Sequence, residues 1–218
     1  MKFTLLCFLP LLTLVGCEGK RETPKPLSVA IPGAATATPA PLLFADIFRR
    51  RPVPPGTDTN VDRVQTERAK HPDSPQANKA VGLAYYAAGG YEAAIQSLTG
   101  LADPEAQLYL GYAHQGRGEY ELAEKSYVAA QKASTRGEAL SALGLLRANQ
   151  GKSKLAQETL LLAVKSLSSG KLRATAFAAL GRLESDPVKA REWYDKTRKD
   201  DPENPWLQKL SQEPKLSR

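Results

Sequence analysis

Two glycine-containing triplets, at 151–153 and 116–118, come closest to motifs that bind a substrate or a nucleotide. Gly-Lys-Ser at 151–153 matches the end of a phosphate-binding loop, but that loop needs a glycine five residues earlier, where Leu146 stands. Gly-Arg-Gly at 116–118 could begin a dinucleotide fingerprint, but no strand pattern precedes it and no third glycine follows. We therefore expect both triplets to be turns between helices.

The side chains that could bind a metal or transfer protons are few and isolated. His71 and His114 are the two histidines, and neither has a cysteine, another histidine or paired carboxylates at metal-ligand spacing. Glu-Ser-Asp at 184–186 lies at an expected helix end, with no histidine within reach by sequence. The sequence predicts no catalytic residue, no metal site and no cofactor.

A specific covalent chemistry is predicted only at Cys17. Lys2 precedes an apolar run from Phe3 to Gly16 that stops at Cys17, which is the pattern of a secretory signal. Fourteen residues make about 21 Å of helix, short of the ~30 Å hydrocarbon core of a bilayer. Pro10 also interrupts the run, so we do not expect a membrane-spanning anchor.

Residues 14–17, Leu-Val-Gly-Cys, resemble the lipobox of bacterial lipoproteins. The resemblance implies that 1–16 is a signal peptide, that the chain is cleaved before Cys17, and that diacylglycerol is attached to the Cys17 sulfur. Ordinary signal cleavage near Gly19 and an uncleaved anchor are the alternatives. Cys7 would leave with the signal, and two or more acyl chains on Cys17 would hold the protein durably on a membrane.

The resemblance to a lipobox implies that the protein lies in a bacterial cell envelope. Glu18 follows Cys17, where an aspartate retains some lipoproteins at the inner membrane, so the periplasmic side of the outer membrane is favoured. The outer face of the cytoplasmic membrane is the alternative.

A proline-rich linker is predicted at 17–57, since eight of the sixteen prolines lie between residues 18 and 57. As a flexible coil it would reach roughly 35 Å, and fully extended about 120 Å. Within it, the apolar segment Leu42–Phe48 is followed by three arginines that end at Arg51. This segment could pack against the first repeat helices, bind a partner protein or contact anionic lipid.

An internal repeat follows the linker. Four glycines recur 29, 33 and 37 residues apart within apparent helices, a period typical of stacked helical hairpins. They are Gly82, Gly111, Gly144 and Gly181, and an alanine follows each by nine to twelve residues: Ala94, Ala123, Ala156 and Ala190. A glycine inside a helix costs roughly 1 kcal/mol relative to alanine. We therefore expect a neighbouring helix to pass too close for a β-carbon, with Ala123 at the crossing with Gly111.

The second unit, 104–134, is the clearest. After the turn at 116–118, a stripe of Tyr120, Ala123, Tyr127 and Ala130 predicts a helix with one buried face, and Glu124 is expected on its solvated face. In the fourth unit we expect Asp186 to cap a helix that starts at Pro187. Helices at about 59–70 and around Trp206 are expected to cap the two ends.

These units resemble the tetratricopeptide repeat (TPR) family. Its pattern of Leu-Gly, a Gly-Tyr turn, alanine, an aromatic and alanine is met most fully by Leu110, Gly111, Gly118, Tyr120, Ala123, Tyr127 and Ala130. The early tryptophan of the family is missing, and Arg147 and Ser153 stand at expected aromatic sites. The resemblance implies an all-α, right-handed α-solenoid of about four TPR-like hairpins with flanking cap helices, over 58–213, before a tail at 214–218. An irregular helical bundle is the alternative.

The resemblance also implies a binding groove on the first helix of each unit. Its exposed lining would be Gln76, Lys79, Leu83, Tyr86, Leu108, Tyr112, Gln115, Leu145 and Arg182, together with Glu105, Glu138, Ser141, Ala148, Thr175 and Ala178. This lining is mostly neutral, and it lacks the Lys/Asn cluster that binds a C-terminal carboxylate in chaperone-binding members. An apolar peptide or helix is therefore the expected ligand.

The sequence thus predicts a membrane-anchored lipoprotein adaptor that binds a protein or peptide of the envelope. A permanent structural or assembly subunit of an envelope complex, such as a pilus or outer-membrane assembly lipoprotein, is the alternative. The net charge of +7 does not indicate nucleic acid, because export removes that partner and the basic residues are not interleaved with exposed aromatics. An envelope enzyme has no support in the sequence.

Overall fold

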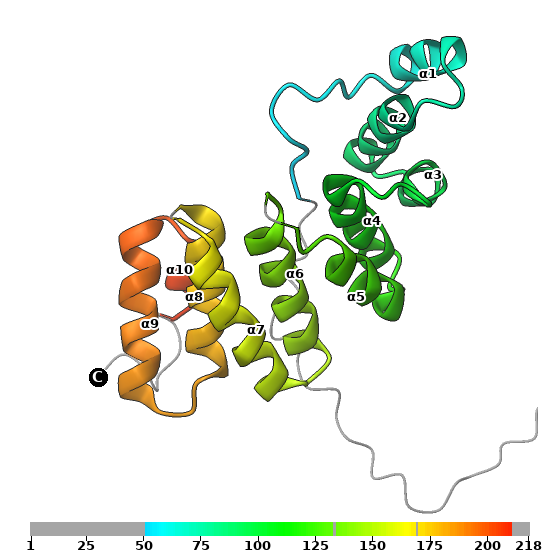
Figure 1. Ribbon diagram of the computed structural model, residues 1–218. Coiled ribbons are helices and arrows are strands. Elements are labelled where there is room, and N and C mark those ends of the chain that lie inside the picture. Colours follow the sequence, from blue (N-terminus) through cyan, green and yellow to red (C-terminus); the bar gives the residue numbers. More distant parts are fainter. Residues whose placement is uncertain (1–50, 133, 169, 211–218) are drawn as a thin grey trace, which may run out of the picture. The chain divides into compact units, whose positions relative to one another are not determined.

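A computed structural model of the protein describes residues 51–132, 134–168 and 170–210, and the side chains of all but the last three of these. These residues belong to one compact unit of the chain, and among them there are helices and turns but no strand (Figure 1). The predicted all-α class is confirmed. The predicted signal peptide, Cys17, the linker up to residue 50 and the tail at 214–218 lie outside the described residues.

Ten helices follow one another in the described part of the chain. They are α1 (Val61–Lys70), α2 (Pro75–Ala88), α3 (Tyr91–Leu98), α4 (Pro104–Gly116), α5 (Tyr120–Ala129), α6 (Arg136–Asn149), α7 (Ser153–Ser166), α8 (Lys171–Leu183), α9 (Pro187–Asp200) and α10 (Pro205–Leu210). Consecutive helices pack as the pairs α2–α3, α4–α5, α6–α7 and α8–α9, while α1 packs on α2, and α10 on α8 and α9 (Figure 1).

Short sequence signals set the helix starts. Asp186 accepts a hydrogen bond from the backbone N–H of Val188 at 2.9 Å, and Pro187 is the first helical residue, as predicted. Ser74 and Asp103 cap α2 and α4 in the same way, each with a proline at the next position. The two triplets at 116–118 and 151–153 lie at the α4–α5 and α6–α7 junctions, so their interpretation as turns is confirmed.

Each repeated glycine lies against one large side chain of the paired helix. A β-carbon on Gly82, Gly111, Gly144 or Gly181 would lie 2.5 to 2.7 Å from a side-chain carbon of Leu98, Tyr127, Leu160 or Tyr194, respectively. Real β-carbon contacts are essentially never that short. Only glycine therefore leaves the space that these side chains fill.

The space at Gly111 is filled by a residue that sequence reasoning did not name. Ala123 is fully buried, but the side chain that covers Gly111 is Tyr127, one helical turn further along α5. The glycine therefore makes room for a ring and not for a neighbouring backbone.

The apolar core continues from each helix pair to the next. One cluster joins α2 and α3 to α4, a second joins α4 and α5 to α6, and a third joins α6 and α7 to α8 and α10. Each pair thus shares its buried surface with its neighbours, which is how a chain of helical hairpins acquires a continuous core.

Glu124 was expected on the solvated face of its helix, and this expectation was wrong. Its carboxylate accepts hydrogen bonds from Nε and Nη2 of Arg147 on α6, at 3.0 and 2.7 Å, and Nζ of Lys152 lies 3.5 Å away. Burial raises the pKa of Glu124, but the two cations outweigh that effect and lower it. Arg147, which stands where an aromatic residue was expected, therefore links α5 to α6.

Gly111→Leu should destabilise the fold, because the new side chain must displace the ring of Tyr127. Overpacking of this kind costs about 1 to 3 kcal/mol, which corresponds to a fall of several degrees in the thermal midpoint. Thermal unfolding followed by circular dichroism measures it. Glu121→Ala, at an exposed position of α5, is the control, and equal midpoints for the two variants would contradict the packing described.

Candidate functional site

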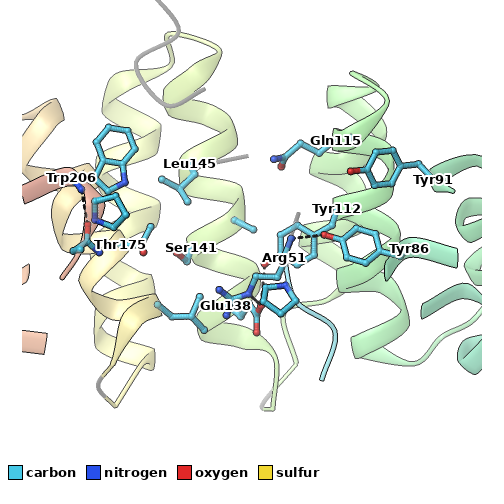
Figure 2. A pocket seen from close by; sticks show the side chains of 16 residues that line it. Arg51, Tyr86, Tyr91, Tyr112, Gln115, Glu138, Ser141, Leu145, Thr175 and Trp206 are labelled. Carbon is cyan, nitrogen blue, oxygen red and sulfur yellow. Dashed lines mark hydrogen bonds and ion pairs between the residues drawn. The ribbon is translucent and has the colours of Figure 1, made fainter. Parts of the chain in front are cut away.

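A pocket of about 270 Å³ opens among the first helices of the pairs (Figure 2). Its wall consists of Tyr86 from α2, Tyr112, Gln115 and Gly116 from α4, Glu138, Ser141, Ala142 and Leu145 from α6, and Leu172 and Thr175 from α8. Tyr91 of α3, Arg51 and Pro52, and residues 204–206 at the start of α10 complete it. Segments from both ends of the described chain therefore meet at one site.

Many side chains predicted for the groove line this pocket. They are Tyr86, Tyr112, Gln115, Glu138, Ser141, Leu145 and Thr175. Gln76, Lys79 and Arg182 lie outside the pocket wall. Lys79 instead pairs with Asp103 and Glu105, with its Nζ 2.9 and 2.7 Å from their carboxylates.

The expectation that the groove side chains are exposed was wrong for the central ones. Leu83, Tyr86, Leu108 and Leu145 are 5%, 2%, 2% and 8% exposed. Ser141, Ala148 and Ala178 are buried as well. The reason is that α2 packs on α4, and α6 on α8, so the first helices cover much of the face that they were expected to present.

Five tyrosines form a continuous aromatic cluster at one side of the pocket: Tyr86, Tyr91, Tyr109, Tyr112 and Tyr127. Edge-on contacts join the rings of Tyr86 and Tyr109 at 5.2 Å, and those of Tyr112 and Tyr127 at 5.4 Å between centroids. Burial, followed by the charge of Glu138, raises the pKa of Tyr112 well above its ordinary value. The Tyr112 hydroxyl therefore stays neutral and donates a hydrogen bond to Glu138.

The tyrosine hydroxyls and Glu138 hold the residues that lead into α1. Tyr86 Oη accepts a hydrogen bond from the backbone N–H of Arg51 at 2.8 Å, and Tyr109 donates to the carbonyl of Pro52 at 2.7 Å. Glu138 Oε1 accepts from Nε of Arg51 at 2.8 Å and from the Tyr112 hydroxyl at 3.1 Å. Arg51 and Pro52 are thereby bound to α2, α4 and α6, and Figure 2 shows Arg51 beside Tyr86 and Glu138.

The opposite wall comes from the C-terminal cap. Trp206 is 6% exposed and packs in the cluster that contains Leu145, and Arg182 lies over its ring, 4.6 Å from the centroid. The buried Asn204 accepts a hydrogen bond from the Trp206 backbone N–H at 3.2 Å. The predicted cap helix therefore also shapes the pocket.

Sequence reasoning missed Arg51, Pro52, Tyr91, Leu172 and Trp206 as pocket residues. The sequence held one indication for Arg51. This residue ends the basic run after Leu42–Phe48, and packing of that segment against the repeat helices was one of its predicted roles. Trp206 was assigned to a cap helix. These residues come together because consecutive helix pairs stack on one another, and no local sequence pattern predicts that stacking.

The histidines, which could bind a metal or transfer protons, lie in a turn and beside a single carboxylate. His71 lies between α1 and α2, and Nδ1 of His114 lies 2.7 Å from Oε2 of Glu119. Within 51–132, 134–168 and 170–210, no three histidine, cysteine or acidic residues are grouped so that they could hold a metal ion. None of the helices in these ranges is long and apolar enough to span a membrane.

Comparison with known proteins gives no match: no protein-family model fits the sequence, and no curated protein is significantly similar to it.

Glu138→Gln should loosen the hold on Arg51, because the ion pair is lost while the Tyr86 hydrogen bond remains. Hydrogen–deuterium exchange should become faster in the peptide that contains Arg51. Global stability should change by less than about 1 kcal/mol, since both side chains of the pair are partly exposed. Glu121→Gln on α5 is the matched control, and unchanged exchange at Arg51 would show that Glu138 does not hold it.

Proposed function

We propose that this protein is a peptide-binding adaptor of the TPR type, a right-handed solenoid anchored to a bacterial envelope membrane through a lipid on Cys17. The observation that carries the proposal is the pocket, whose wall comes from the first helices of successive pairs. The repeated glycines of these pairs and the large side chains on them support a repeat architecture. No catalytic role is part of the proposal.

The composition of the wall favours an apolar ligand. Its charged residues are Arg51 and Glu138, and these two neutralise each other through their ion pair. Tyrosine, leucine and tryptophan side chains make up much of the remainder. The volume of about 270 Å³ lies just below the roughly 300 to 1,000 Å³ typical of ligand pockets, so the site would take one or two large side chains of a peptide or helix.

Leu172→Asp should weaken peptide binding, because it places a charge in the half-buried apolar wall. The assay is selection of peptides from a displayed library on the detergent-extracted full chain, followed by calorimetry with the selected peptides. We expect at least tenfold weaker binding to Leu172→Asp, which is about 1.4 kcal/mol. Leu162→Asp, at a 47% exposed leucine of α7, is the matched control.

A second pocket variant, Thr175→Arg, tests the same prediction if Leu172→Asp fails to fold. Circular dichroism checks that both variants are folded. If the selected peptides bind the wild-type chain and all of these variants equally, the peptide-binding site lies outside the pocket. A failure to select any peptide would contradict the adaptor function itself.

The second candidate function is a permanent subunit of an envelope complex. It is favoured by apolar side chains on the second helices, where Leu155 and Leu162 lie two turns apart on α7 and are 48% and 47% exposed. Apolar surface of this kind marks protein interfaces when it is contiguous. A permanent subunit should co-purify in fixed stoichiometry after mild detergent extraction, whereas an adaptor should lose its ligand on dilution.

Cys17→Ser should leave an uncleaved precursor without acylation, because the lipobox cysteine supplies the sulfur that is modified. Intact mass and metabolic labelling with a fatty acid measure this directly. Cys7→Ser is the control and should be processed normally. Normal acylation of the Cys17→Ser chain would contradict the proposed anchor.

A further inference from the structure

The described chain begins inside the wall of the pocket. Arg51 is a wall residue, its backbone N–H donates to Tyr86, and its side chain is held by Glu138. Because that N–H belongs to the peptide bond with residue 50, the preceding residue is attached at the pocket wall. The chain that precedes Arg51 therefore starts next to the apolar surface of the pocket.

The preceding residues have the composition that the pocket favours. The segment Leu42–Phe48 reads Leu-Leu-Phe-Ala-Asp-Ile-Phe, and its phenylalanines are four residues apart. That spacing is the one by which an amphipathic helix places anchors in an apolar groove. Phe48 precedes Arg51 by three residues, which span at most about 11 Å even when fully extended.

We propose that Leu42–Phe48 is a ligand of this pocket in its own chain, with Phe48 inserted against the apolar wall that includes Tyr112, Leu145 and Leu172. The pocket volume of about 270 Å³ suits one or two large side chains, as a short segment would provide. The attachment at Arg51 fixes the direction from which the segment arrives. A second copy of the chain or a lipid surface would have no such fixed attachment.

The short covalent connection gives the segment a large advantage over free ligands. A tether of a few residues creates an effective concentration on the order of millimolar. A peptide from another protein must therefore displace Leu42–Phe48 to bind. This consequence rests on the proposed adaptor function, whereas occupation of the pocket by the segment does not.

Photo-crosslinking tests the occupation directly. We would place p-benzoylphenylalanine at position 48 of the full chain, irradiate the detergent-extracted protein and map the adducts by mass spectrometry. Intramolecular adducts on Tyr112, Leu145 or Leu172 are the expected result. Adducts confined to α5, α7 or α9, to a second copy or to the detergent would overturn the proposal.

A competition experiment tests the consequence. A fluorescent peptide of residues 41–52 should bind the Phe48→Asp full chain at least tenfold more tightly than the wild-type chain, as measured by anisotropy, because the tethered competitor is weakened. Glu121→Gln, at an exposed position of α5, should behave as wild type. Equal binding to the Phe48→Asp and wild-type chains, or to neither, would contradict occupation by the segment.

The two proposals can fail separately. If library peptides bind the wild-type and Phe48→Asp chains equally well, the adaptor function stands and occupation by the segment fails. If the 41–52 peptide is the sole ligand and no library peptide binds, the segment proposal stands and the adaptor function fails.

Discussion

The contact between one large side chain and one helical glycine sets the geometry of each helix pair. Because no β-carbon fits at Gly82, Gly111, Gly144 or Gly181, the side chain of the partner helix rests directly on the helix backbone. In the first three pairs the covering residue follows the glycine by sixteen residues, and in the fourth by thirteen. The shorter turn before α9 explains that difference, and the contact itself is preserved.

In the second pair this contact also organises the pocket. The ring of Tyr127 rests on Gly111, its hydroxyl donates to Oε1 of Gln115 at 2.7 Å, and its edge contacts the ring of Tyr112. Gln115 and Tyr112 are both wall residues. The packing that fixes α4 against α5 therefore also orients two side chains of the candidate site.

The tyrosine cluster imposes a second constraint, because a buried hydroxyl without a partner is costly. Tyr86 and Tyr109 meet this requirement with the backbone of Arg51 and Pro52, and Tyr112 meets it with Glu138. The residues before α1 are thus part of the hydrogen bonding of the core. A segment that the composition assigns to a linker is held where it can influence the pocket.

The sequence by itself determined the all-helical class, the helix pairs around the repeated glycines and the Asp186 cap of α9, because glycine period, proline position and apolar stripes act over a few residues or within one hairpin. It also indicated Tyr112, Gln115 and Thr175, which line the pocket. Tertiary structure decided that Tyr127 and not Ala123 covers Gly111, that Glu124 binds Arg147, and that Leu83 and Leu108 are core. It also brought Arg51 to Glu138, 87 residues away. These outcomes depend on which faces of separate hairpins pack together. The residues that stabilise this packing are far apart in the sequence, so no local pattern predicts it.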